Sequence, residues 1–254
     1  MKKNPIMLFI HKTGSPAYFY WLSGKFIPWL WAAFFVLAAW GLYQGLFVAP
    51  TDYLQGESYR IIYIHVASAW MSMMIYGIMA AMGFIALVWH VRISEILMIS
   101  SAPIGAAFTV IALATGSLWG KPTWGTYWVW DARLTSELVL LFLYLGVLGL
   151  HAAIEEPRKA ARSVALLAIV GIVNLPIIHY SVNWWNTLHQ GSTVNLAGES
   201  TIDISMLVPM LVMAIATKFF YGAVLLSRAR VLLLTQDIKK QWAGKALQNP
   251  GVHP

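Results

Sequence analysis

The chain contains no cysteine and few charged residues. Charged residues make up 11% of its 254 positions, against about 25% in an average soluble domain. The missing cysteine excludes disulfides, thiolate metal sites, thiol catalysis and covalent attachment of a prosthetic group through a C-x-x-C-H motif on this chain. The low charge excludes an ordinary soluble fold, because a chain that is 59% hydrophobic cannot cover its surface with polar groups.

Long apolar runs, by contrast, are plentiful. A helix needs about 20 apolar residues to cross the core of a bilayer, and the runs are continuously apolar rather than alternating, which favours helices over barrel strands. The first run is longer than the apolar core of a signal peptide, and no A-x-A cleavage pattern follows it. We therefore expect an all-α integral membrane protein with a single membrane domain, 1–254. Its six expected transmembrane spans are about 26–48, 61–90, 96–119, 134–154, 163–182 and 204–226.

The basic residues fall on one side of the predicted membrane. The segment before the first span and the connections 91–95, 155–162 and 227–254 hold 13 of the 17 Lys and Arg residues. Because short cytoplasmic connections carry the excess of Lys and Arg, both termini are predicted in the cytoplasm. This distribution also accounts for the formal net charge of +7 without a nucleic-acid partner. The connections on the opposite, outer side are then 49–60, 120–133 and 183–203.

Two of these outer connections are unusually rich in tryptophan. An interfacial aromatic belt explains single tryptophans near helix ends. A flat aromatic shelf that stacks on a planar ligand explains a whole cluster. Both interpretations stay open on composition alone. The six tryptophans concerned are Trp119, Trp124, Trp128 and Trp130 in WGKPTWGTYWVWD, together with Trp184 and Trp185.

Histidines gather on the same side. His65 lies about one turn below the outer end of the second span, His179 lies near the outer end of the fifth, and His189 lies in the last outer connection. Two imidazoles from different elements could serve as axial ligands of a haem iron. Either histidine alone is more often a structural hydrogen-bonding residue.

A few charges lie where membrane proteins usually avoid them. Arg60 and Arg133 are cations on the outer side, where they suit the carboxylates of a ligand or ordinary ion pairs with neighbouring acids. Glu137 and Lys218 lie inside predicted spans, so each needs a polar partner or a wet cavity. Structural and functional roles stay open for all four.

Three segments carry a resemblance to a known family. The segment WGKPTWGTYWVWDARLTSELVLLFLY, residues 119–144, resembles the tryptophan-rich WWD signature of haem-handling proteins. The segments SYRIIYIHV and NLPIIHYSVNWWNTLHQGST resemble the CcmC family within that superfamily. The resemblance implies that His65 and His189 are the axial ligands of haem b on the periplasmic face. It also implies a haem-contacting loop formed by Trp119, Trp124, Trp128, Trp130 and Asp131.

The resemblance further implies a function and partners. It implies a haem-binding and transfer protein of the bacterial inner membrane, not an enzyme, that holds haem transiently and delivers it to the periplasmic chaperone CcmE for c-type cytochrome biogenesis. A small membrane peptide, CcmD, and an ATP-binding cassette pair, CcmA and CcmB, are the implied partners. The chain has no Walker A pattern, so any ATP hydrolysis comes from such partners.

Other classes of protein stay open at this stage. A membrane haem-b electron-transfer subunit would need a second haem, for which His90 and His151 are the candidates near the inner side. A permease subunit of an ABC-type transporter would need a polar route through the core. A structural scaffold would keep its function without its histidines.

Overall fold

A computed structural model describes residues 14–189 and 202–248. Within these ranges the regular structure is helical, apart from one isolated bridge between Asp52 and Gly56. Six helical segments among the described residues are long and apolar enough to cross a membrane, which confirms the predicted fold class. The elements are α2 (Pro16–Tyr43), the π-helical η1 (Gln44–Val48), the 3-10 helical η2 (Glu57–Ile61), α3 (Ile62–Trp89), α4 (Arg92–Trp124), α5 (Ala132–Ala153), α6 (Pro157–Gly171), α7 (Asn174–Trp184), α8 (Ile204–Gln236) and α9 (Gln241–Gln248).

Several helix ends differ from the predicted ones for identifiable reasons. Helix α2 begins at Pro16, before the expected start at residue 26, because proline suits the first turn of a helix. Helix α4 continues through the start of the expected outer connection to Trp124 and ends where Gly125 adopts a φ of 80°. The fifth span is broken between α6 and α7, since Pro176 has no N–H to donate to the carbonyl of Ile172.

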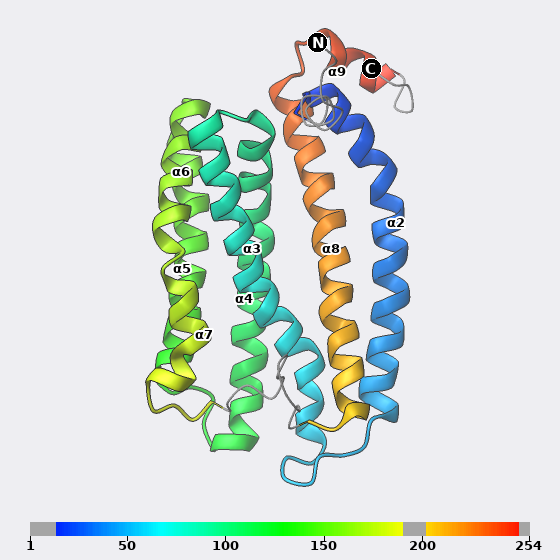
Figure 1. Cartoon of the computed structure of the whole chain (residues 1–254), viewed down its shortest axis with the longest axis vertical. Coiled ribbons are helices and arrows are strands. Elements are labelled where there is room, and N and C mark those ends of the chain that lie inside the picture. Colours follow the sequence, from blue (N-terminus) through cyan, green and yellow to red (C-terminus); the bar gives the residue numbers. More distant parts are fainter. Residues whose placement is uncertain (1–13, 190–201, 249–254) are drawn as a thin grey trace, which may run out of the picture.

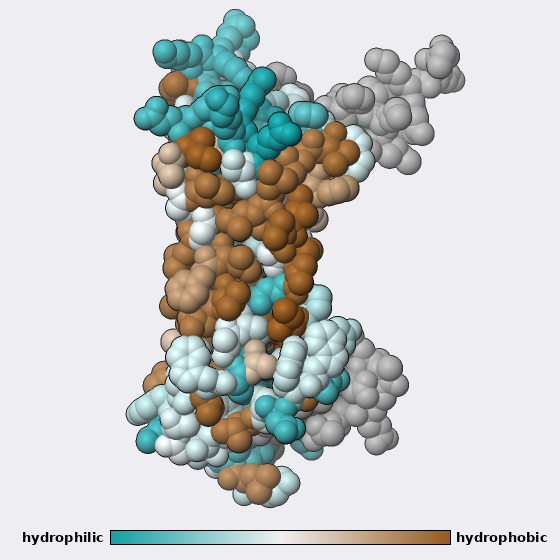
Figure 2. Space-filling view, turned by 90° about the vertical axis from the view of Figure 1, so that its left-hand side faces the viewer, coloured by the Kyte–Doolittle hydropathy of each residue, from teal (hydrophilic) through white to brown (hydrophobic). Residues whose placement is uncertain are grey.

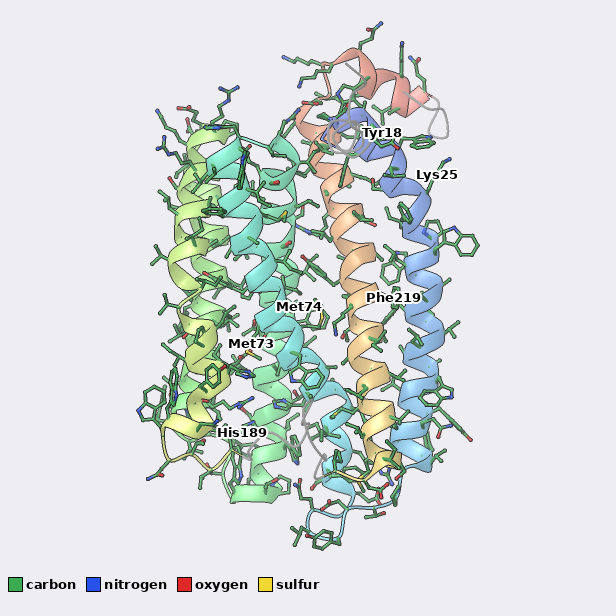
Figure 3. The ribbon with its side chains drawn as sticks, viewed as in Figure 1. Tyr18, Lys25, Met73, Met74, His189 and Phe219 are labelled. Atoms are coloured by element: carbon green, nitrogen blue, oxygen red, sulfur yellow. The ribbon has the colours of Figure 1, made fainter. Side chains whose placement is uncertain are left out.

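The helices form two groups (Figure 1). Helix α2 packs along α8, whereas α3, α4, α5 and α6 pack on one another. Helices α3 and α4 also contact α8, so the groups share one interface. The interior of the larger group is filled by side chains such as Tyr76, Met79, Met98 and Tyr144, all fully buried. Side chains thus fill the space between these helices (Figure 3).

The two ends of the bundle have different surfaces. The start of α2, the end of α8 and α9 lie at one end, and the segments after η1, α4 and α7 lie at the other (Figure 1). An apolar belt separates a strongly hydrophilic end from an end of intermediate hydropathy (Figure 2). At the hydrophilic end, Arg92 donates to both carboxylate oxygens of Asp237 at 2.8 and 2.6 Å. These bonds, with those from Lys240 and Trp242, hold the pKa of Asp237 at about 2.

Candidate functional site

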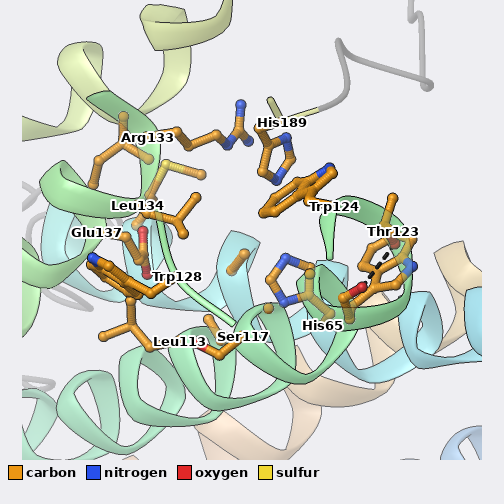
Figure 4. A pocket seen from close by; sticks show the side chains of 17 residues that line it. His65, Leu113, Ser117, Thr123, Trp124, Trp128, Arg133, Leu134, Glu137 and His189 are labelled. Atoms are coloured by element: carbon orange, nitrogen blue, oxygen red, sulfur yellow. Dashed lines mark hydrogen bonds between the residues drawn. The ribbon is translucent and has the colours of Figure 1, made fainter. Parts of the chain in front are cut away.

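A pocket lies at the end of the bundle opposite α9, among α3, α4, α5, α7 and the segment that follows α7 (Figure 4). It contains about 760 Å³ of empty space, counting the part open to solvent. Among its polar and aromatic lining residues are His65, Trp119, Thr123, Trp124, Trp128, Arg133, Glu137 and His189.

His65 stands on the first turn of α3, so its backbone is fixed by the hydrogen bonds of a long helix. Its Nδ1 lies 3.0 Å from the hydroxyl of Thr115 on α4. The ring of Trp119 packs edge-on against it, with centroids 5.6 Å apart and an interplanar angle of 75°. Helix α4 therefore contacts this imidazole at two positions one turn apart.

His189 reaches the same pocket from the segment after α7. Its ring centroid lies 6.5 Å from that of His65 and 6.2 Å from that of Trp124. Its backbone N–H donates to the hydroxyl of Thr187 at 3.0 Å, and that hydroxyl donates to the carboxylate of Asp131. The two histidines singled out in the sequence are thus brought together across one cavity, as Figure 4 shows.

Three of the four tryptophans of the 119–130 segment line the pocket, but not on one helical face. Trp119 and Trp124 belong to α4, whereas Trp128 follows Gly125, which ends the helix. The indole N–H of Trp128 is buried and has no hydrogen-bond partner among the described residues. Trp130 does not line the pocket: it is 74% exposed and packs edge-on against Trp128.

Asp131 lies beside the pocket rather than in its lining. One of its carboxylate oxygens accepts from the backbone N–H of Leu134 at 2.8 Å and caps the start of α5. The other accepts from Thr187. Its contacts therefore connect the start of α5 to the segment that carries His189.

The two outer arginines have different surroundings. Arg133 lines the pocket and extends toward His189 (Figure 4), and none of the ion pairs between described residues involves it. Arg60 is not among the lining residues. It forms an ion pair with Glu57 and donates to the carbonyl of Gly45 at 2.7 Å, which ties η2 to η1.

The charges inside the spans have partners. Glu137 is 8% exposed, lines the pocket and accepts from the hydroxyl of Ser72 at 2.7 Å. Lys218 is exposed on α8, and its ammonium donates to the carbonyl of Ala214, one turn earlier. Only Glu137 belongs to the pocket.

The remaining outer and inner histidines do not line the pocket. His179 is exposed on α7, where its ring packs edge-on against Tyr180. His90 caps the end of α3 with a φ of 54°, and His151 lies in the last turn of α5. Within residues 14–189 and 202–248, no group of three or more His, Cys, Asp or Glu side chains could hold a metal ion.

Sequence reasoning missed three residues that position the histidines. They are Thr115, Gly116 and Thr187, which lie against His65 or His189. Thr115 and Gly116 lie outside the segments that carry the resemblance, and Thr187 lies within one of them but was given no role. Thr115 stands four residues before Trp119, so the two share a face of α4. That spacing is the one signal that could have suggested a role for it.

The fold and the pocket define a multi-pass α-helical membrane protein whose pocket is lined by two histidines and three tryptophans from separate elements. The family model described as CcmC, Heme exporter protein C, matches residues 9–244, and the chain belongs to this family. It is 48% identical over 242 residues to Heme exporter protein C of Escherichia coli K12, covering 95% of this chain and 98% of the relative.

Other relatives extend the similarity. Heme exporter protein C of Haemophilus influenzae is 45% identical over 238 residues, covering 94% of this chain and 96% of the relative. A putative cytochrome c biosynthesis ccmC-like mitochondrial protein of Marchantia polymorpha is 41% identical over 220 residues, covering 87% and 93%. The resemblance carried by the sequence motifs is confirmed.

Proposed function

We propose that this chain binds haem between His65 and His189 and passes it on during the maturation of c-type cytochromes. Family membership supports haem handling, since the bacterial relatives carry the name of haem exporters and the plant relative that of cytochrome c biosynthesis. The observation that carries the proposal is that the two imidazoles, far apart in the sequence, share one pocket.

The separation of the imidazoles suits a shared iron. Metal–imidazole bonds are about 2.0–2.1 Å long, so two rings on one metal have centroids about 6 Å apart. The observed separation of 6.5 Å is close to this value. A bare ion would need further protein ligands, and the described residues offer no larger cluster. A haem iron brings the porphyrin nitrogens with it and needs only two axial ligands.

The other lining residues suit the macrocycle and the propionates of a haem. Trp119, Trp124 and Trp128 provide aromatic surface for a flat macrocycle. The guanidinium of Arg133 suits a propionate, because its planar fork matches a carboxylate. The buried N–H of Trp128 costs about 1–3 kcal/mol while unpaired, and an acceptor on the ligand would remove this cost. Arg60 stays a sequence prediction, since its described contacts are with Glu57 and Gly45.

The location and partners belong to the same proposal. The positive-inside rule supports a cytoplasmic location for the hydrophilic end, and the pocket then faces the periplasm from the bacterial inner membrane. Haem b is held through its axial ligands, and the absence of cysteine excludes thioether attachment to this chain. It is passed to a CcmE-like chaperone, within an assembly that includes a CcmD-like peptide and CcmA- and CcmB-like subunits. The chain itself binds, orients and releases the haem and performs no catalysis.

Single cysteines test the orientation on a cysteine-free background. A cysteine at Tyr53, which is 91% exposed in the segment after η1, should react with an impermeant thiol reagent added to the periplasm. A cysteine at Ile238, after α8, should react only once the inner membrane is opened. The opposite pattern would place the pocket on the cytoplasmic side and refute this part of the proposal.

An absorption spectrum of the purified protein tests the function itself. We expect one six-coordinate haem per chain in the wild type, and its loss in His65→Gly/His189→Gly. Two haems per chain would instead indicate an electron-transfer subunit. Wild-type haem content in the double variant would refute axial ligation by this pair.

A further inference from the structure

His65 rests against one turn of α4, and the contacts there differ at its two ring nitrogens. We propose that Thr115 is a positioning residue that fixes the tautomer of His65, with the proton on Nδ1, and so directs the free electron pair of Nε2 into the pocket. The inference rests on the proposed function, because it concerns how this histidine is prepared for an iron. Thr115 is not among the residues that line the pocket, so it acts through His65.

The hydrogen bonds of Thr115 determine the direction of the bond to His65. The hydroxyl of Thr115 lies 2.6 Å from the carbonyl oxygen of Ile111 and 3.2 Å from that of Ala112. A carbonyl oxygen can only accept, so the single hydroxyl proton is directed to the α4 backbone. The oxygen of Thr115 then accepts from Nδ1 of His65, which lies 3.0 Å away. That nitrogen must carry the proton, which leaves Nε2 as the basic nitrogen.

Gly116 makes room for this arrangement. A β-carbon at position 116 would lie 2.9 Å from Cε1 and 3.4 Å from Nδ1 of His65, closer than ordinary carbon contacts. The ring can therefore approach α4 closely enough to reach Thr115 only because residue 116 is glycine. Trp119, whose indole N–H donates to the side chain of Gln55 at 2.6 Å, packs edge-on against the same ring.

A histidine ligates a metal through an unprotonated nitrogen, and the hydrogen bond at the other nitrogen sets which one is free. Such outer partners commonly change metal affinity by about 10–100-fold when removed. Without Thr115 the proton of the neutral ring can move to Nε2, and the ring must change its tautomer before it can bind iron. We therefore expect Thr115 to affect the affinity and the reduction potential of the bound haem, not merely the amount of folded protein.

The chain offers a matched control. Thr109 lies on the same helix, is fully buried and donates to the carbonyl of Gly105 at 2.8 Å, but it does not line the pocket. Thr109→Val and Thr115→Val therefore remove the same hydroxyl and the same kind of backbone bond from α4. Thr115→Ser keeps the hydroxyl and should restore the wild-type behaviour.

The test has one readout without haem and one with it. In the haem-free protein at one fixed pH, the ring ¹⁵N shifts of His65, assigned with His65→Gly, should report the proton on Nδ1. In Thr115→Val the proton should redistribute toward Nε2, whereas Thr109→Val and Thr115→Ser should keep it on Nδ1. In haem titrations of the full-length protein, Thr115→Val should raise the dissociation constant about tenfold and shift the midpoint potential.

The outcomes separate this inference from the proposed function. If the wild type binds haem with axial histidines but Thr115→Val has wild-type ring shifts and affinity, the role of Thr115 is refuted while the haem site stands. If the wild type has the proton on Nδ1 but takes up no haem, the proposed function fails and the inference about an iron ligand fails with it. A proton on Nε2 in the wild type overturns the inference directly.

Discussion

The wall of the pocket that carries His65 and the wall that carries His189 are built differently. His65 stands on α3, a continuous helix, and α4 holds its ring at Nδ1. His189 lies outside the regular helices, where its backbone is held through Thr187 and the carboxylate of Asp131. A continuous hydrogen-bonded helix resists local opening more than a segment outside the regular helices. We infer that His65 is the permanent anchor and that His189 is the ligand that moves to admit and release haem.

Removing either histidine should cause the largest loss of haem affinity, and the two losses should differ in size. We expect His65→Gly to weaken haem binding about 100-fold and His189→Gly about tenfold. The second loss is smaller because α3 and α4 still hold His65 in place when His189 is removed. Free imidazole should restore six-coordination in both variants if the pocket survives. Titration of haem into each purified variant measures the difference. Equal haem affinities and equal rates of transfer to the chaperone in the two variants would refute the different roles of His65 and His189.

Arg133 and Arg60 should differ by about tenfold in their effect on haem. Arg133→Gln removes a cation that faces the pocket and is not engaged in an ion pair with a described residue, so haem affinity should fall by about 1.5 kcal/mol. Arg60→Gln should leave haem affinity near the wild-type value and lower the melting temperature instead, since its contacts hold η2 to η1. Haem titration and thermal unfolding of both variants decide this. A larger loss of haem in Arg60→Gln would assign the propionate to the other arginine.

Replacing a tryptophan that lines the pocket should lower haem occupancy more than replacing the exposed Trp130. Trp124→Ala and Trp128→Ala should each lower haem occupancy several-fold, by about 1 kcal/mol, while abundance in the membrane stays near normal. Trp130→Ala should change occupancy little, because this side chain is largely exposed and outside the lining. Haem per chain, measured by absorbance against protein, provides the comparison. Loss of the protein with unchanged occupancy per molecule would instead favour an interfacial belt.

Asp131 should affect haem binding indirectly, by holding Thr187 and so the backbone of His189. Asp131→Asn weakens the bond from Thr187, so we expect haem binding to fall about fivefold, by about 1 kcal/mol. The loss should disappear when the substitution is made in His189→Gly and persist in His65→Gly, which a double-mutant cycle measures. A loss of equal size in both backgrounds would mean that Asp131 contacts the haem itself.

A substitution at the hydrophilic end of the bundle, away from the pocket, should change stability without changing haem binding. The pKa of Asp237 is about 2 in the folded protein against an ordinary 3.8, so its ionised form is stabilised by folding. That stabilisation, about 2 kcal/mol, is fully present above about pH 4 and is lost as the pH falls toward 2. Asp237→Asn should therefore lower the free energy of unfolding at pH 7 by about this amount, measured by thermal unfolding in detergent. Haem per folded chain should not change, and the two proteins should converge in stability at acid pH.

The number and order of the spans could be predicted because the solvent is lipid. A backbone in the bilayer must satisfy its own hydrogen bonds, so each long apolar run becomes a helix. The bundle confirms six such helices in the described residues. Their ends were less predictable, because they depend on single residues such as Gly125, where α4 stops, and Pro176, which breaks the fifth span.

The sequence by itself determined which residue types were candidates for a binding site: the outer histidines, a group of tryptophans and two arginines. It could not show that Arg133 faces the pocket while Arg60 is tied to Glu57, or that Asp131 holds Thr187. Nor could it show that Thr115 and Gly116 seat the ring of His65. Hydrophobic length and charge bias are properties of one segment at a time, so the sequence displays them directly. Contacts between side chains of different helices depend on how those helices pack, and only the tertiary structure decides that.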